Sequence, residues 1–312
     1  MRGGVQAGVA VLCARPGSGA SRSGEVELKE GTRADLDAAN EDPPFGSYAP
    51  NAFQALILRL TRAMPDTWFK RRVAFVLRRL VTTPLSHPLD VEVFGRRMRL
   101  APFANVAEKR ILFTPQYFDA EERAVLAAHA GEGFVFLDIG ANIGGYALFV
   151  AGLGLKHARV IAIEPQPELF ERLTYNISLN RDRPVKAIAC ALADKDGEMT
   201  LFLDAGNKGQ SSLKMVGWGG ERGESLQVPT KTLLTLAREE GLERIDAVKI
   251  DIEGAEDLVL VPFFRDAPES LWPRLVVMES VRGRWRVDCI QLCLDNGYRL
   301  VAKTRNNVIL ER

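Results

Sequence analysis

The sequence is poor in the residues on which several classes of protein depend. It contains 4 cysteines and 3 histidines among 312 residues, and its formal net charge is only +1. Cys289 and Cys293 lie four residues apart on an expected helix, without a neighbouring histidine or second cysteine pair. We therefore expect buried, reduced thiols rather than a metal site. The small net charge gives no overall indication of a nucleic-acid partner.

Long apolar stretches are also absent from the sequence. None is long enough for a transmembrane helix, and Val5–Cys13 makes a poor signal peptide because Gly8 interrupts its short apolar core. Reduced cysteines and the lack of a convincing signal predict a cytoplasmic location. The hydrophobic fraction of 46% still permits a full-sized core, so we expect a soluble globular chain.

What the sequence does contain is a strand, a glycine turn and a helix within Phe134–Val150. An apolar run ends at Asp138, and Gly140 and Gly144 bracket the turn into the helix. Such a turn exposes bare backbone N–H groups and the positive end of the helix dipole to a ligand. Asn142 takes the place of the middle glycine of a dinucleotide fingerprint, and a carboxylate at Asp138 would repel a diphosphate. A ligand with ammonium and carboxylate groups fits better, such as the methionine end of S-adenosylmethionine (SAM).

Acidic residues recur at the ends of the expected strands. One apolar run ends at Glu164, which is 24 positions after Gly140, close to the roughly 20 residues at which an acid meets a ribose diol in Rossmann-like sites. The other acids at strand ends are Asp138, Asp194, Asp251 and Glu279. Ligands of open α/β sheets bind outside the carboxyl ends of the strands. Five carboxylates there would suit a positively charged ligand such as SAM.

Expected strands and helices alternate from Phe134 onward. This alternation predicts an α/β fold with a mostly parallel central sheet and helices on both faces. Further elements are expected as a third strand at 185–192, an extra strand at 199–204, a mobile loop at 207–225, a helix at 230–242, and a closing antiparallel pair at 298–303 and 307–310.

The chain divides into three segments by composition. Residues 1–50 are rich in Gly, Ser, Ala and charge, and we expect a disordered N-terminal tail. Residues 51–104 are expected to form a basic helical segment and a β-hairpin cap, with the hairpin at 89–100. Residues 105–312 are expected to form the main domain.

The segment 51–80 has the pattern of two amphipathic helices. Their expected apolar faces comprise Phe53, Leu56, Ile57 and Leu60, and then Val73, Leu77 and Leu80. Seven arginine and lysine residues make the segment strongly basic. We favour a helical cap that docks on the main domain and keeps a solvated basic face. The alternative is peripheral contact with an anionic membrane.

Four motifs occur in a fixed order along the chain. They are DIGANIGGY at 138–146, IAIEP at 161–165, ALADKDGEMTLF at 191–202 and KIDIEGAE at 249–256. In this combination the chain resembles the FkbM-type SAM-dependent methyltransferases, from about Asn105 to the C-terminus. The resemblance implies a Rossmann-like class I methyltransferase fold and SAM as the cofactor. It also implies O-methylation of a hydroxyl on a sugar, glycan, lipid or polyketide-like small molecule.

The expected cofactor site combines the motifs with the acids at the strand ends. We expect Gly140, Asn142 and Gly144 to shape the turn under the methionine end of SAM. Asp138 is expected near the SAM amine, and Glu164 at the ribose hydroxyls. Asp194 lies where comparable methyltransferases hold the adenine amine, although DKDG is also a strong turn sequence by itself.

The expected catalytic group is a carboxylate base that removes the proton of the acceptor hydroxyl. Asp251 is the first candidate, and Glu253 and Glu279 are alternatives. These three could also gather Mg²⁺, but without a nearby histidine we predict no metal. Glu256 is expected to be solvated, and Lys249 to pair with a neighbouring carboxylate.

Two other classes of function compete with methyl transfer. An NAD-dependent oxidoreductase is disfavoured by Asn142, by Asp138 and by the lack of a catalytic Lys, Tyr or His constellation. A non-catalytic scaffold with a degenerate SAM fold would use the basic helices to contact a membrane or nucleic acid, but the intact glycine turn and Glu164 argue against degeneracy. We expect no nucleic-acid partner and a small-molecule or glycan acceptor.

Overall fold

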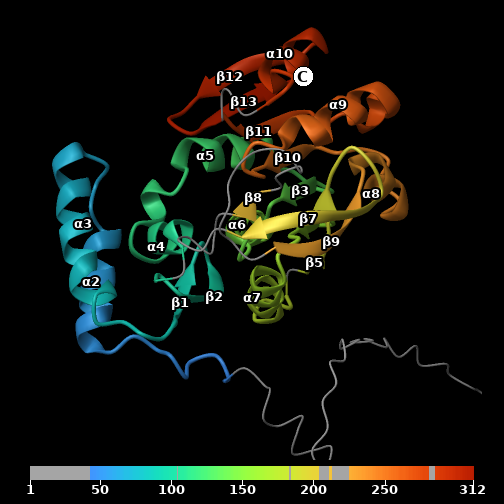
Figure 1. Ribbon diagram of the computed structural model, residues 1–312. Coiled ribbons are helices and arrows are strands. Elements are labelled where there is room, and N and C mark those ends of the chain that lie inside the picture. The colour runs from blue at the N-terminus through green and yellow to red at the C-terminus, as the bar shows by residue number, and fades with distance from the viewer. Residues whose placement is uncertain (1–42, 104, 183, 204–210, 213–224, 281–284) are drawn as a thin grey trace, which may run out of the picture. The chain divides into compact units, whose positions relative to one another are not determined.

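The computed structural model describes residues 43–103, 105–182, 184–203, 211–212, 225–280 and 285–312. Residues Pro44–Arg312 form one compact unit (Figure 1). Most of the predicted tail at 1–50 lies outside the described residues. Residues 44–50 are held against the hairpin, because the backbone N–H groups of Gly46 and Tyr48 donate to the Asp90 carboxylate over 2.7 and 3.2 Å.

A seven-stranded sheet forms the centre of the unit and confirms the predicted α/β fold. Its order is β12 (Arg299–Lys303), β13 (Asn307–Glu311), β11 (Leu275–Glu279), β10 (Ala247–Ile250), β3 (Val135–Ile139), β4 (Arg159–Ile163) and β5 (Val185–Ile188). The strands from β11 to β5 are parallel, and β13 runs antiparallel to both of its neighbours, as the closing pair was predicted to do.

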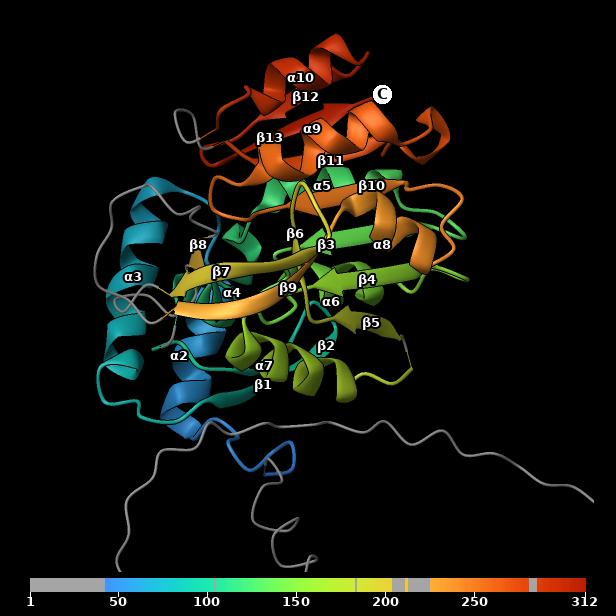
Figure 2. The same ribbon diagram turned by 45° about the vertical axis from the view of Figure 1, so that its right-hand side comes forward.

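Helices cover both faces of this sheet (Figures 1 and 2). Phe136 of β3 packs into one hydrophobic core with α6 (Gly145–Gly152) and α7 (Pro167–Ser178). Leu137, the next residue, packs into a second core with α8 (Leu233–Glu239), α9 (Glu256–Asp266) and α10 (Cys289–Asp295). Burial of successive residues on opposite faces explains why the parallel strands read as continuous apolar runs.

Two boundaries predicted in the middle of the chain were wrong. The expected third strand divides into β5 and β6 (Ala191–Leu192), and β6 belongs to a second sheet of order β6-β9-β7-β8. That sheet contains the predicted extra strand as β7 (Gly197–Leu203), with β8 (Ser211–Ser212) and β9 (Ser225–Lys231). The helix expected at 230–242 begins later because β9 extends to Lys231 and Thr232 caps α8. The loop expected at 207–225 lies outside the described residues apart from β8 and Ser225.

Between residues 43 and 134, the described part of the chain contains four helices, the hairpin and one short turn of 3₁₀ helix. Its elements are α2 (Ala52–Arg62), α3 (Trp68–Thr82), β1 (Leu89–Val93), β2 (Arg96–Leu100), α4 (Val106–Phe113), the 3₁₀ turn Pro115–Tyr117 and α5 (Ala120–His129). A second 3₁₀ turn, Glu269–Leu271, precedes β11. The described residues include no helix long and apolar enough to cross a bilayer.

Most of the residues predicted for the apolar faces of the first two helices are exposed, although Ile57 is buried and Val73 and Leu77 are partly buried. Helix α2 buries Ile57, Leu58 and Thr61, while Phe53, Leu56 and Leu60 are exposed. On α3 the buried residues are Ala74 and Val81, and Leu80 is exposed. The Thr61 hydroxyl donates to the carbonyls of Ile57 and Leu58, so this polar group can be buried on the side of α2 that faces the protein.

The thiol prediction is confirmed for the described cysteines. Cys190, Cys289 and Cys293 are free and buried. Cys13 lies outside the described residues. Burial raises the pKa of Cys190 to about 11, which keeps this thiol in its neutral form.

Candidate active site

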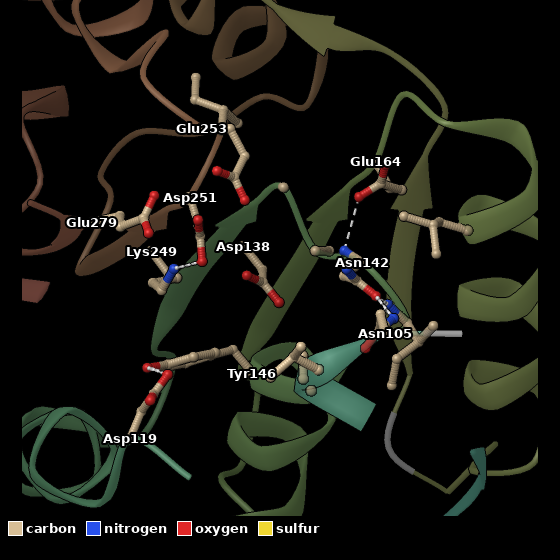
Figure 3. Close-up of a pocket in the computed structure, with 18 of the residues that line it drawn as sticks. Asn105, Asp119, Asp138, Asn142, Tyr146, Glu164, Lys249, Asp251, Glu253 and Glu279 are labelled. Carbon is tan, nitrogen blue, oxygen red and sulfur yellow. Dashed lines mark hydrogen bonds and ion pairs between the residues drawn. The ribbon is translucent and has the colours of Figure 1, made fainter. Parts of the chain in front are cut away.

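A cavity of about 310 Å³ opens where the parallel strands β3, β4, β10 and β11 end (Figure 3). Four of the five acids predicted at strand ends line it, namely Asp138, Glu164, Asp251 and Glu279. Asp194 is exposed and does not line the cavity, and its contact with adenine stays a prediction. The volume lies near the lower end of the roughly 300–1,000 Å³ usual for ligand pockets.

The glycine turn after β3 depends on close backbone packing. Gly140 has a φ of +77°, and a side chain built there would overlap the backbone carbonyl oxygen of Asp251. Only glycine therefore allows β3 and β10 to meet at this point. Gly144 has a φ of +93° but does not line the cavity, and a Cβ at this position would lie 2.9 Å from the side chain of Leu173.

The backbone N–H groups of Gly140, Ala141 and Asn142 are occupied, so the expectation of bare donors was wrong for these three residues. Those of Gly140 and Ala141 donate to the carbonyl of Ile163 over 3.0 and 2.9 Å. Asn142, with a φ of +52°, donates its backbone N–H to the Glu164 carboxylate over 2.8 Å. A ligand in the cavity would meet carboxylate oxygens and the open side of the turn.

Glu164 holds two segments in place, the turn after β3 and the loop after β4. One carboxylate oxygen accepts from Asn142, and the other accepts the N–H of Gln166 over 3.0 Å. The Glu164 residue is only 5% exposed. Burial raises its pKa to about 7, although both hydrogen bonds act in the opposite direction. The charges of Asp138 and Asp251 act in the same direction as burial.

Lys249 lies buried between two carboxylates on neighbouring strands. Its Nζ lies 2.9 Å from Oδ2 of Asp251, so the predicted pairing with a neighbouring carboxylate is confirmed. Lys249 also lies opposite Asp138 in the register of β10 and β3. Burial lowers the pKa of Lys249, but the charges of both carboxylates and the hydrogen bond to Asp251 raise it overall. Burial raises the pKa of Asp138 to about 6, against the effects of Lys249 and of the Ala147 N–H that donates to it over 2.9 Å.

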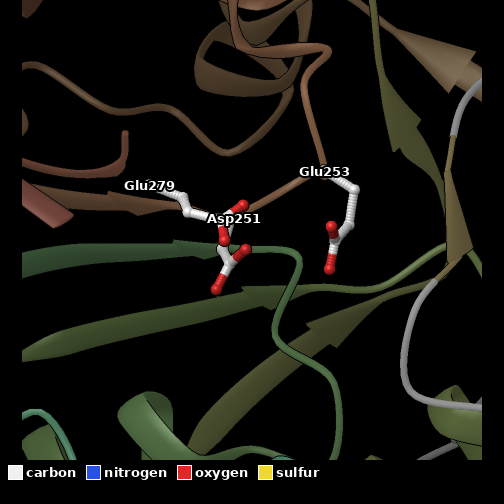
Figure 4. A group of neighbouring side chains, drawn as sticks. All are labelled: Asp251, Glu253 and Glu279. Atoms are coloured by element: carbon white, nitrogen blue, oxygen red, sulfur yellow. The ribbon is translucent and has the colours of Figure 1, made fainter. Parts of the chain in front are cut away.

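Three carboxylates gather at one side of the cavity (Figure 4). One oxygen each of Asp251, Glu253 and Glu279 lies within 4.8 Å of the others. Burial, and then the charges of Asp251 and Glu253, raise the pKa of Glu279 to about 8. Oε2 of Glu279 is buried and has no hydrogen-bond partner within the described part of the chain. This side of the cavity is suited to a cation or a proton.

The segment before β3 contributes residues that sequence reasoning missed. Asn105, which caps α4, lines the cavity and donates from Nδ2 to the side chain of Asn142 over 3.3 Å. Tyr146 donates its hydroxyl to Asp119 over 3.0 Å, and Arg110 donates to the same carboxylate over 2.8 Å. Tyr146 was visible within the DIGANIGGY motif, whereas no local pattern indicated that Asp119 would reach it.

Glu256 was predicted to be solvated, and this was wrong. It is fully buried, and its carboxylate accepts from the backbone N–H groups of Ile252 and Gly254 and from the indole of Trp285. These hydrogen bonds fix the loop that carries Glu253, which has a φ of +56°. Glu256 therefore supports the shape of the cavity from behind.

Comparisons with known proteins agree with this geometry. Residues 138–285 match the family described as the methyltransferase FkbM domain. The resemblance to the FkbM-type methyltransferases is confirmed over these residues. Methyltransferase sdnD of Sordaria araneosa is 31% identical over 173 residues, which cover 46% of this chain and 65%, just under two thirds, of that relative.

Two further proteins show how far the similarity extends. The 31-O-demethyl-FK506 methyltransferase FkbM of Streptomyces tacrolimicus is 28% identical over 201 residues, covering 55% of this chain and 75% of that protein. Among solved structures, Aeropyrum pernix fibrillarin with bound SAM aligns at a TM-score of 0.37 and 12% identity, over 61% of this chain and 73% of that one.

The match to methyltransferases supports S-adenosylmethionine as the cofactor. The cavity suits that cofactor in charge, since the sulfonium and the ammonium outweigh one carboxylate. Two basic side chains, Lys249 and Arg110, face six carboxyl groups among the described lining residues, which are Asp119, Asp138, Glu164, Asp251, Glu253 and Glu279. The unpaired oxygen of Glu279 belongs to this set. The family match does not support the NAD-dependent oxidoreductase considered from the sequence.

The raised pKa values predict how the stability of the ligand-free protein depends on pH. Glu279 has an ordinary pKa of 4.5, and about 8 in the folded protein. Between these values the folded state binds more protons than the unfolded state, so its free energy of unfolding falls as pH rises. We expect thermal unfolding midpoints to show a smaller loss of stability from pH 5 to pH 8 in Glu279→Gln than in the wild type.

The matched control for this experiment is Glu198→Gln, which changes an exposed residue of β7. The control should keep the pH dependence of the wild type. If Glu279→Gln lost as much stability as the wild type over the same range, Glu279 would not carry the raised pKa.

Proposed function

We propose that the chain transfers the methyl group of SAM to a hydroxyl oxygen of a small-molecule acceptor, with Asp251 as the base. The main support is the position of Asp251 at the end of β10, where it lines the cavity and its side chain is 42% exposed. SAM supplies an activated methyl group on its sulfonium. The protein must align the acceptor oxygen and receive its proton, and alignment contributes up to about 7–11 kcal/mol in ideal cases.

Lys249 supports this role for Asp251 by fixing its orientation. The ammonium holds Oδ2, while the side chain as a whole stays accessible from the cavity. A base must lie within hydrogen-bond reach of the proton that it removes. Asp251 therefore combines a fixed orientation with access, whereas Glu164 is almost fully buried between two loop N–H groups.

Glu253 and Glu279 remain alternative bases, and the three carboxylates together could also hold Mg²⁺. Oxygen ligands at this separation suit such an ion. We favour catalysis without a metal. Dialysis against EDTA distinguishes the two mechanisms: methyl transfer that persists supports a carboxylate alone, and a loss that Mg²⁺ restores supports a bound ion.

Glu164→Gln is expected to weaken SAM binding about tenfold or more, as measured by isothermal titration. We propose that the Glu164 carboxylate accepts hydrogen bonds from the ribose hydroxyls, and hydrogen bonds to charged groups contribute about 1.5–3 kcal/mol. Glutamine retains one oxygen to accept a loop N–H. Glu168→Gln, which changes an exposed residue in the first turn of α7, is the matched control. Unchanged SAM affinity in Glu164→Gln would refute the ribose assignment.

The remaining contacts of the protein with SAM are also proposals. Asp138 is assigned to the SAM amine, directly or through water, and Asp194 to the adenine amine. Gly140, Asn142 and Gly144 shape the turn under the methionine end. We further propose that residues 105–312 form the catalytic domain and that residues 51–104 form its cap.

The acceptor class is proposed as a hydroxyl-bearing sugar, glycan, lipid or polyketide-like molecule. The Streptomyces relative is named for 31-O-demethyl-FK506, which supports an oxygen acceptor on a small molecule. A transfer assay with tritiated SAM over cell-envelope glycans and secondary metabolites tests this proposal. If SAM bound but label passed only to nitrogen, or to RNA, the proposed O-methylation would be wrong.

A further inference from the structure

The helices α2 and α3 expose an unusual number of large apolar side chains. These residues are between 42% and 70% exposed and comprise Phe53, Leu56 and Leu60 on α2, and Trp68, Phe69, Phe75, Val76 and Leu80 on α3. On α2 they recur three and four positions apart, and on α3 the adjacent pairs 68/69 and 75/76 recur seven positions apart and Leu80 follows four positions after Val76, so each set shares one face of its helix. Contiguous exposed apolar surface of this kind marks a site of interaction.

Basic side chains are interleaved with these apolar residues. Arg72 and Arg79 are exposed and lie on the same face of α3 as Trp68, Phe75 and Val76. The Arg72 guanidinium lies 4.5 Å from the Trp68 ring centroid. Residues 52–82 contain seven basic residues and one acid, Asp66, which is paired with Arg71. The surface therefore carries a strong positive charge together with its apolar groups.

A shallow hollow of about 620 Å³ joins this surface to the rest of the domain. Trp68, Phe75, Val76 and five arginines line it, and four of these arginines lie on α3. The fifth is Arg305, in the turn between β12 and β13, next to Asn306, which lines the catalytic cavity. Consecutive residues, Arg305 and Asn306, therefore line the hollow and the catalytic cavity. Helices α2 and α3 lie at the left of Figure 1.

We propose that α2 and α3 bind the surface of an anionic lipid bilayer, with their apolar side chains in the headgroup and acyl boundary. A helix that lies in this boundary combines an apolar face with Arg and Lys that meet anionic lipids. Each such basic residue contributes to attraction by negatively charged headgroups. The surface meets both requirements, and the partner is identified by complementary charge.

The aliphatic members of the surface favour a bilayer over a nucleic acid. Leu56, Leu60, Val76 and Leu80 offer no flat ring on which a base could stack, and RNA recognition relies on stacking and phosphate contacts. A bilayer takes up aliphatic and aromatic groups alike. Arg305 and Asn306 then place the catalytic cavity close to the headgroups, where a membrane-borne hydroxyl would be within reach.

Vesicle binding tests the proposal with the full chain and without any acceptor. We expect the protein to sediment with phosphatidylglycerol vesicles and to stay in solution with phosphatidylcholine vesicles. Arg72→Glu/Arg79→Glu should weaken binding to the anionic vesicles about tenfold or more. Trp68→Ser/Phe69→Ser should also weaken it, and most strongly at high salt, where the electrostatic attraction is screened.

The control variants change exposed apolar residues and exposed basic residues elsewhere on the domain. Leu294→Ser/Leu300→Ser matches the apolar pair, and Arg181→Glu/Lys195→Glu matches the charge reversal. Both should bind vesicles like the wild type, and all variants should bind SAM by titration, which separates docking from catalysis. No sedimentation of the wild type would overturn the proposal. So would equal loss in the controls, binding of an RNA oligonucleotide instead of vesicles, or a dimer that only the α3 variants disrupt.

Discussion

With asparagine in place of Asp251, the rate constant for methyl transfer should fall roughly 10²- to 10⁴-fold, the range that a positioned base contributes. The substitution preserves the size of the side chain, and its amide oxygen can still accept a hydrogen bond from Lys249. It removes the group that takes up the proton of the acceptor hydroxyl. SAM affinity should stay close to that of the wild type, because the proposed ribose and amine contacts belong to other strands.

The measurement compares kcat and SAM binding for the same variant. Methyl transfer is followed with tritiated SAM and an acceptor from the panel that the wild type labels, and SAM binding is followed by titration. Asp266→Asn is the matched control, since the Asp266 side chain is 46% exposed, near the 42% of Asp251, and pairs with Arg265. The control should retain the kcat of the wild type.

A loss of SAM affinity in step with kcat would contradict the assignment, because it would place Asp251 among the cofactor contacts. Unchanged kcat would move the base to another carboxylate. Glu279→Gln is then the first variant to test, because Oε2 of Glu279 lies buried beside Asp251 and Glu253 without a hydrogen-bond partner within the described residues. In the ligand-free protein its raised pKa of about 8 favours the protonated form. A cation bound beside it would favour its ionised form.

The elements around the cavity could be predicted because their signals are local. The apolar run before Asp138, the glycines of the turn and the acid that ends each strand all lie within a few residues of one another. Parallel strands then bring their carboxyl ends to one edge. Four carboxylates that are far apart in the sequence therefore line one cavity, as expected.

The errors concern features that depend on distant parts of the chain. The burial of Glu256 depends on Trp285, which lies 29 residues later and supplies an indole N–H. The second sheet requires β6 to pair with β9, and β6 is only two residues long. The orientation of α2 depends on α4 and the hairpin, where Arg62 donates to the carbonyls of Leu112 and Glu92. No periodicity within α2 contains that information.

Gly140→Ala should abolish measurable SAM binding, with a loss of affinity of about a hundredfold or more. The added methyl group would overlap the carbonyl oxygen of Asp251, which is backbone and cannot swing aside. The φ of +77° adds strain for any residue with a Cβ. Since both effects act at once, β3 and β10 must separate at the point where the cofactor turn and the proposed base meet.

Gly241→Ala isolates the contribution of backbone strain. Gly241 has a φ of +58° and open space around its Cβ position, at the end of α8 and far along the chain from the turn. Both variants should lose stability, by about 1–3 kcal/mol for the strained conformation, and thermal unfolding measures that loss. Only Gly140→Ala should also lose SAM binding, as measured by titration below the unfolding temperature.

The comparison of the two glycine variants also tests how the site is built. If Gly140→Ala bound SAM with the same affinity as Gly241→Ala, the turn would only connect β3 to α6 and would not form part of the cofactor site. If instead it lost binding while remaining folded, the contact between Gly140 and Asp251 would connect cofactor binding to catalysis. Displacement of Asp251 should then reduce kcat even at SAM concentrations that restore partial occupancy.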